Sequence, residues 1–165
     1  MTEQEYKEHF KNLAEKHKSI LHTDSSKAFF YIESVDELTE FDKGLALMKK
    51  DVCMLLVASG GEFDDNNSEN HTDEQTGEIY ILMRKKNASK INDLYSGAKE
   101  ILKECLARTK QDFRINPNPH KRFRISKIPY QKVGPMNDLW YGYMATVTFV
   151  CPFGYTVNSG TWTDK

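Results

Sequence analysis

The sequence predicts a single α+β domain, in which a mostly antiparallel sheet packs against a long amphipathic helix and an N-terminal helix. Two patterns favour this class: helical spacing of apolar residues at the start and past the middle of the chain, and aromatic, β-branched runs of strand length between and after them. The length of 165 residues is typical of one domain and leaves no room for a second. We therefore treat residues 1–165 as one folding unit.

The N-terminal part of the chain predicts a helix followed by a strand. Over residues 2–22, apolar side chains recur at three- and four-residue steps while Lys and Glu occupy the other faces. The polar residues 23–26 form the turn that ends this helix. Residues 28–33, Ala-Phe-Phe-Tyr-Ile-Glu, are aromatic and β-branched, which is typical of a strand.

A second helix and a buried strand are expected next. Ser34 and Glu37 have the spacing of a capping box, and an apolar stripe continues to Met48, with Gly44 as a point where the helix could break. Residues 52–58 form a continuous apolar run of strand length. Such a run predicts a strand that is covered on both faces and lies centrally in the sheet.

The middle of the chain predicts a hairpin and then the long helix. Residues 60–77 are polar and acidic, so we expect them to form a long hairpin loop that leads into a strand at residues 78–85. Apolar residues between 91 and 106 form a stripe over four helical turns, with Ser89 as the expected N-cap.

The C-terminal part predicts strands joined by proline-containing turns. Asn116-Pro117-Asn118-Pro119 marks a loop, and Gly134-Pro135 is expected to turn the chain. Residues 139–151 are long, aromatic and β-branched, hence a strand. One face of that strand is expected to carry Tyr141, Tyr143, Ala145, Val147 and Phe149. Residues 153–165 are expected to form a mobile tail or a last short strand.

Composition excludes several classes of protein. Lys and Arg number 23 and Asp and Glu number 24, so a protein whose whole surface binds phosphate is not expected. No apolar run approaches the roughly 18 residues that span a bilayer, and the first ten residues are unlike a signal peptide, so we predict a cytoplasmic chain without a membrane partner. Cys53, Cys105 and Cys151 lie in separate apolar stretches, which predicts buried free thiols.

Acidic residues concentrate in the predicted hairpin loop. Residues 60–78 hold seven Asp and Glu and no Lys or Arg. An EF-hand loop counted from Asp64 fails, because Glu69 stands where glycine is required and Gln75 where the bidentate Glu belongs. We expect a solvated hairpin tip and keep open two alternatives, a contact with a partner or neighbouring subunit and a metal site. The acidic residues predicted for interaction are Glu62, Asp64, Asp65, Glu69, Asp73 and Glu74.

A basic segment without any acid spans residues 114–127. Its alternating pattern fits a strand with Phe123 and Ile125 inward and a solvated basic face, but it also suits a protein contact or single-stranded nucleic acid. The basic residues predicted for interaction are Arg114, Lys121, Arg122, Arg124 and Lys127. One acidic and one basic segment in a nearly neutral chain are what a head-to-tail ring of identical subunits needs.

No known catalytic motif accompanies these segments. The sequence has no G-x-S-x-G, Walker A, dinucleotide-binding or H-E-x-x-H motif, and its five histidines show no metal-ligand spacing. His17 lies on the apolar stripe of the first helix, where a structural role is expected. We predict a non-enzymatic protein with no catalytic residue, cofactor or metal.

The element order carries a resemblance to a known family. Its points are the N-terminal helix, the strand Lys27-Ala-Phe-Phe-Tyr-Ile, the apolar strand at Val52, the polar-tipped hairpin, the long helix at Ile91 and the closing Trp140-Tyr-Gly-Tyr-Met-Ala-Thr-Val-Thr-Phe. In this order the chain resembles the small tail-terminator (tail-completion) and neck-associated proteins of long-tailed bacteriophages and prophages. The helix expected at residues 34–50 and the C-terminal tail have no place in that pattern.

The resemblance implies a non-enzymatic structural protein of a phage or prophage particle. Such proteins form rings, often hexameric, that cap the tail tube and meet the head connector. The implied partners are copies of the same chain and tail or head-connector proteins, in the host cytoplasm and in the virion. The alternative hypothesis is a small nucleic-acid-binding or regulatory module that uses residues 114–127. An enzyme of unknown reaction ranks third.

Overall fold

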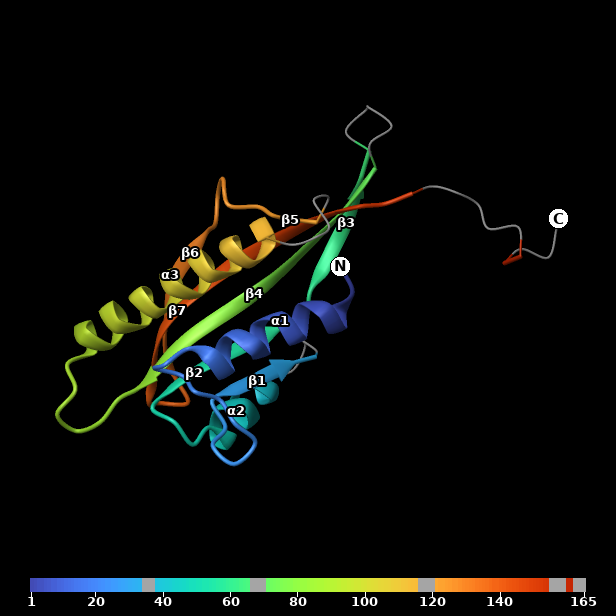
Figure 1. Cartoon of the computed structure of the whole chain (residues 1–165). Coiled ribbons are helices and arrows are strands. Elements are labelled where there is room, and N and C mark those ends of the chain that lie inside the picture. The colour runs from blue at the N-terminus through green and yellow to red at the C-terminus, as the bar shows by residue number, and fades with distance from the viewer. Residues whose placement is uncertain (34–37, 66–70, 116–120, 155–159, 162–165) are drawn as a thin grey trace.

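A mixed sheet of seven strands carries helices on both of its faces in the computed structural model, which describes residues 1–33, 38–65, 71–115, 121–154 and 160–161. This arrangement confirms the predicted α+β class, with the long helix packed on the sheet (Figure 1). The elements are α1 (Glu3–Lys16), β1 (Phe29–Ile32), α2 (Leu38–Leu47), β2 (Val52–Val57), β3 (Gly60–Asp64), β4 (Thr72–Arg84), α3 (Ile91–Ile115), β5 (Arg122–Phe123), β6 (Tyr130–Met136) and β7 (Trp140–Pro152).

The sheet is built around two long strands. Its order is β1-β2-β4-β7-β5, and β3 pairs with β4 while β6 pairs with β7. β4 and β7 are 13 residues each and pair along their whole length, from Thr72 opposite Pro152 to Arg84 opposite Trp140. The β1–β2 pair is parallel and the other pairs are antiparallel, so the expectation of a mostly antiparallel sheet is confirmed.

The helix α1 begins at a complete capping box. The Thr2 hydroxyl accepts the Glu5 N–H at 3.1 Å, and the Glu5 carboxylate accepts the Thr2 N–H at 2.9 Å. The helix ends at Lys16, six residues before the predicted end, because His17 has an extended backbone. Ile20 is nevertheless fully buried, so the chain beyond the helix still packs on the core.

The helices α1 and α3 cover the same face of the sheet. The helix α3 is 25 residues long and buries most of the predicted stripe, including Ala98, Leu102 and Cys105, whereas Ile91 at its start is exposed. Ser89 is not its N-cap: the Ser89 hydroxyl accepts the Lys86 N–H at 3.3 Å, in the turn before the helix. The large core beneath α1 and α3 also contains the β7 side chains Tyr143, Ala145, Val147 and Phe149, which confirms that these four residues share one face of that strand.

The helix α2 covers part of the opposite face, over β1 and β2. It continues through Gly44 without a break, and a Cβ there would lie 2.7 Å from the Phe30 ring, so glycine allows the helix to approach β1 closely. Ser34 and Glu37, the predicted capping box, lie outside the described residues. A second apolar cluster on this face includes Leu45, Leu55 and Trp140.

The expectation of a loop over residues 60–77 is wrong. Residues 60–64 form β3, residues 72–77 belong to β4, and the two strands pair antiparallel from Gly60 opposite Thr76 to Asp64 opposite Thr72. Every residue of β3 is exposed. The extended conformation of β3 therefore comes from backbone pairing with β4, and not from burial of apolar side chains.

A second correction concerns the turn before β7. The chain reverses at Asn137 and Asp138, which have φ of 44° and 57°, and the Leu139 N–H donates to the Met136 carbonyl at 3.2 Å. Two central residues with positive φ are typical of a type I′ hairpin turn. Gly134 and Pro135 instead lie within β6, where the pairing with β7 is interrupted by a register shift.

One end of the sheet extends past the helices. Figure 1 shows the β3–β4 hairpin and the end of β7 projecting beyond α1 and α3. We call this region the arm and define it as β3, β5, residues 72–77 of β4 and residues 147–152 of β7. The Phe63 ring of the arm stacks on Phe153 at 4.5 Å, while most of the predicted tail lies outside the described residues.

None of the described helices is long and apolar enough to cross a membrane.

Candidate functional site

The acidic residues predicted for interaction lie along the arm. Glu62 and Asp64 are on β3 and Asp65 follows it, and all three are exposed. Asp73 and Glu74 lie on β4, where Glu74 is only 9% exposed. Glu69 lies outside the described residues. The described part of the acidic segment therefore forms an edge strand and its neighbour instead of a loop.

The basic residues lie at the other edge of the same sheet. Arg122 is in β5, the last strand in the sheet order, and Arg124 follows it. Arg114 is in the last turn of α3, and Lys127 lies between β5 and β6. These four residues are exposed, while Lys121 is partly buried.

Phe123 and Ile125 were both expected to point inward from the basic strand, and only Phe123 does. Phe123 is buried, with its ring 5.2 Å from that of Phe149. Ile125 is 46% exposed, so that expectation is wrong. The reason is that β5 ends at Phe123, so the alternation of inward and outward side chains does not extend to Ile125.

Two of the predicted basic residues are paired inside the molecule. Arg124 Nη2 forms an ion pair with the Glu74 carboxylate, which joins the basic segment to the acidic one within a single chain. Lys121 Nζ lies 2.9 Å from both carboxylate oxygens of Glu5. The hydrogen bond from Lys121, together with that from the Thr2 backbone, lowers the pKa of Glu5 below its usual range.

The residues left for contacts with other molecules are therefore fewer than the sequence suggests. In the part of the chain that the structure describes, no ion pair involves Glu62, Arg114, Arg122 or Lys127. Glu62 marks the acidic edge and Arg122 the basic edge. The structure thus separates the exposed charges of opposite sign by the width of the arm.

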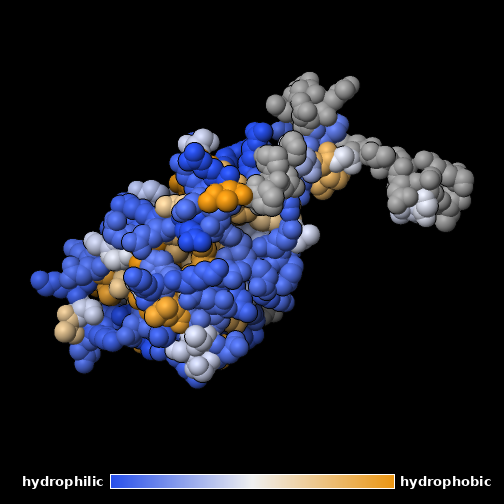
Figure 2. Space-filling view, in the orientation of Figure 1, coloured by the Kyte–Doolittle hydropathy of each residue, from blue (hydrophilic) through white to orange (hydrophobic). Residues whose placement is uncertain are grey.

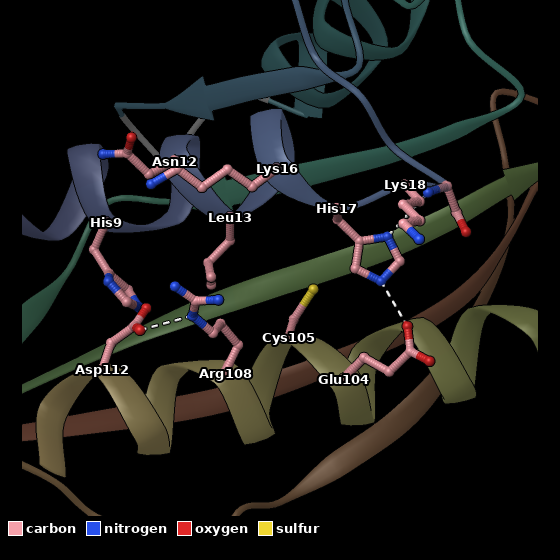
Figure 3. Close-up of a pocket in the computed structure, with 11 residues that line it drawn as sticks. His9, Asn12, Leu13, Lys16, His17, Lys18, Glu104, Cys105, Arg108 and Asp112 are labelled. Atoms are coloured by element: carbon pink, nitrogen blue, oxygen red, sulfur yellow. Dashed lines mark hydrogen bonds and ion pairs between the residues drawn. The ribbon is translucent and has the colours of Figure 1, made fainter. Parts of the chain in front are cut away.

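A groove between α1 and α3 was not predicted. It has a volume of about 740 Å³, and Leu13 and Cys105 are among its lining residues. Figure 3 shows charged side chains from α1, from the residues after it and from α3 along its two sides. His17 Nε2 lies 2.7 Å from Glu104 Oε2, and Arg108 Nε donates to Asp112 Oδ1 at 2.7 Å. Much of the charge in the groove is therefore engaged in pairs between groove residues.

His9 at one end of the groove has a structural role. Its Nε2 lies 3.1 Å from the Thr109 hydroxyl, which donates its own hydrogen to the Cys105 carbonyl at 2.9 Å. Since the Thr109 hydrogen is already used, His9 Nε2 must be the donor. Burial lowers the pKa of His9 to about 4, so the imidazole is neutral at pH 7. Its ring packs edge-on against Phe10 and Phe113.

Two of the three cysteines, Cys53 and Cys105, are unreactive thiols. All three are free and buried, as predicted. Burial raises the pKa of Cys105 to about 12 and raises that of Cys53 further, so both are protonated thiols at pH 7. Among the described residues, no three His, Cys, Asp or Glu side chains are grouped so that they could hold a metal ion.

A cluster of lysines and tyrosines on α3, β6 and β7 was also missed. Lys99 Nζ donates to the Tyr130 hydroxyl at 3.1 Å and lies 4.8 Å from the centre of that ring. Lys132 lies 4.9 Å from the Tyr95 ring centre. The Lys99 hydrogen bond lowers the pKa of Tyr130. Tyr95 and Lys99 are one helical turn apart, which is the sequence signal that could have shown part of this cluster.

The surface around α1 and α3 is mainly hydrophilic. Figure 2 shows small, separate apolar areas on this face and no broad apolar patch. Contacts on this face would therefore be largely polar. This favours charge over hydrophobic area as the basis of any association here.

Comparisons with known proteins do not assign a family. No protein-family model matches the chain, and no curated protein matches it. The resemblance to phage tail-terminator and neck proteins rests on the order of elements.

Proposed function

We propose that this chain is a non-enzymatic structural protein that assembles with copies of itself into a ring. One observation carries the proposal: the acidic strand β3 and the basic strand β5 lie on opposite edges of the arm, and the edge residues Glu62 and Arg122 are both exposed. Identical subunits that associate through two different surfaces form a closed ring when the rotation between neighbours closes. Opposite charge on the two surfaces favours this head-to-tail contact.

The particle we propose for this ring is that of a long-tailed phage or prophage, at the head–tail junction. The element order of the structure supports it, since the N-terminal helix, the apolar strand, the hairpin, the long helix and the closing strand follow one another as in the family pattern. Tail and head-connector proteins are the proposed partners of the ring. The host cytoplasm and the virion are its proposed locations.

The chemistry of the groove supports a structural role over a catalytic one. The His17–Glu104 and Arg108–Asp112 pairs engage four of the side chains that line it, and His9 is held by Thr109 and by aromatic packing. The Cys105 thiol is buried and protonated. The His9–Thr109 and His17–Glu104 contacts hold α1 and the residue after it against α3, while the Arg108–Asp112 pair lies within α3, and this structural role is the one we assign to them.

Nucleic-acid binding through residues 114–127 has weaker support. Lys121 and Arg124 are in ion pairs with Glu5 and Glu74, so phosphate would have to compete with carboxylates of the same chain. Nucleic-acid binding through this segment predicts an affinity for single-stranded DNA or RNA that falls steeply as the salt concentration rises. A titration at two salt concentrations measures this slope directly.

Negative-stain electron microscopy of the purified protein at low salt tests the proposal. We expect closed rings of uniform diameter, fewer of them at high salt, and binding of the rings to the ends of isolated phage tail tubes. Single particles of monomer size at every concentration would overturn self-assembly. Rings that bind neither tail tubes nor head connectors would overturn the phage role and leave the assembly role in place.

A further inference from the structure

One row of paired residues crosses the arm from edge to edge. Glu62 of β3 is opposite Glu74 of β4, Glu74 is opposite Val150 of β7, and Val150 is opposite Arg122 of β5. Side chains that are directly opposite on neighbouring strands point to the same face of a sheet. The row therefore begins with an acid at one edge and ends with an arginine at the other, on one face.

The direction of the edge strands is equally specific. β3, β4, β7 and β5 are antiparallel to their neighbours in that order, so β3 and β5 run in opposite directions. If a second copy is placed beside the first without reversing its strands, its β3 comes next to β5 of the first copy. The two strands are then antiparallel, and the alternation of the arm continues across the contact.

We infer that the subunits join by strand pairing, with β3 of one copy against β5 of the next copy, so that the sheet of the arm continues from subunit to subunit. In this contact Glu62 lies beside Arg122 of the next copy, on the same face. The inference rests on the proposed self-assembly and adds to it the surfaces, the strand direction and the register.

The properties of β3 fit this role. All five of its residues are exposed, it pairs with β4 on one side, and no other strand among the described residues pairs with it. Exposed edge strands of this kind are open to pairing with another chain. Charge favours β5 of another copy as the strand that pairs with β3. Two β3 strands paired with each other would place acidic residues side by side, whereas β5 places Arg122 beside them.

A disulfide experiment tests the contact. Glu62 and Arg122 are separated within one chain by β4 and β7, a distance of roughly 14 Å at the usual strand spacing. A disulfide needs the two Cα atoms within about 7 Å, so Glu62→Cys and Arg122→Cys in one chain can be joined only between copies. The native cysteines are buried, which keeps the background low.

Under mild oxidation at low salt, we expect the double-cysteine chain to give a ladder of covalent multimers on a non-reducing gel. An equal mixture of the two single-cysteine variants should give covalent dimers that contain one chain of each kind. Asp51→Cys with Arg122→Cys is the matched control, because Asp51 is an exposed acid beside Arg84, at the end of β4 that is opposite to the arm, and it should give no ladder.

Charge exchange gives an independent readout. Glu62→Arg alone and Arg122→Glu alone should each weaken association by roughly tenfold, and the combined variant should recover the wild-type mass by light scattering. If the wild-type protein forms no oligomer at any salt, the proposed self-assembly and this inference both fail. If it forms oligomers but the cysteines do not join and the exchange gives no recovery, only the strand contact is overturned.

Discussion

Gly77 shows how closely α1 is packed on the arm at the level of single atoms. Gly77 lies in β4, and a Cβ at this position would come within 2.8 Å of the Tyr6 ring and closer still to the Tyr6 hydroxyl. Tyr6 is fully buried, and its hydroxyl donates to the Val57 carbonyl at 3.2 Å. The absence of a side chain at residue 77 is therefore required for this contact between α1 and the sheet.

We predict that Gly77→Ala lowers the free energy of unfolding by about 2 kcal/mol, because the buried Tyr6 has to shift and loses its hydrogen bond. Urea unfolding measures the change. The matched control is Gly60→Ala, since a Cβ at that strand position meets nothing within 4 Å. Equal effects of the two substitutions would contradict the packing argument.

His9 makes the stability of the fold depend on pH. Its pKa is about 4 in the folded protein because of burial, against about 6.5 in the unfolded chain. The unfolded chain therefore takes up a proton first as the pH falls. The contribution of neutral His9 is complete above about pH 6.5 and is lost as the pH falls toward 4.

The expected loss from this group is about 2 kcal/mol between pH 7 and pH 5. His9→Gln keeps a donor for Thr109 but cannot take up a proton, so the pH dependence of the variant should be weaker by about this amount. Urea unfolding at the two pH values, for wild type and variant, measures the difference. Parallel pH curves for the two proteins would show that His9 is not the group responsible.

At the scale of elements, an ion pair holds the basic segment against the long strand β4. The Arg124 guanidinium reaches Glu74, whose side chain is only 11% exposed. Removing the arginine leaves a nearly buried carboxylate without its partner. This lowers the free energy of unfolding by more than the intact pair contributes to it. The Lys121–Glu5 pair is more exposed, with side chains 25% and 49% accessible.

We predict that Arg124→Leu lowers the free energy of unfolding by about 2 kcal/mol, and that adding Glu74→Gln restores about half of it. Lys121→Leu, the control, should cost less than about 1 kcal/mol because its pair is solvated. A double-mutant cycle in urea measures these values. A cycle without any coupling between residues 74 and 124 would contradict the ion pair.

The elements that sequence could predict are those defined by their own side chains. α3 and β7 carry long apolar patterns of period 3.6 and 2, and both were predicted in type and face. β3 has no such pattern, since its Gly-Gly-Glu-Phe-Asp sequence is extended only because β4 pairs with it. The turn at Asn137 and Asp138 was missed because Gly134-Pro135 is a stronger local signal, although it lies inside β6.

At the scale of the whole molecule, the decisive features come from contacts between distant residues. The sequence identified both charged segments, but not that Arg124 and Glu74 neutralise each other or that Glu62 and Arg122 lie at opposite edges. The groove between α1 and α3 is lined by residues about a hundred positions apart, such as His9 and Asp112, and no local pattern contains that information.

The arm gives the molecule two edges of opposite charge, and a ring is the assembly that uses both in every subunit. Since the edge charges are exposed, their attraction should weaken as salt screens it. The association is therefore expected to be strongest at low salt, in contrast to an interface built on apolar area.

The most direct test is the mass of the purified protein by light scattering coupled to size exclusion, at low and at high salt. Head-to-tail association through the arm gives a mass of several subunits at low salt that falls toward that of one chain at high salt. A mass of one chain at both salt concentrations, in a concentrated sample, would contradict it.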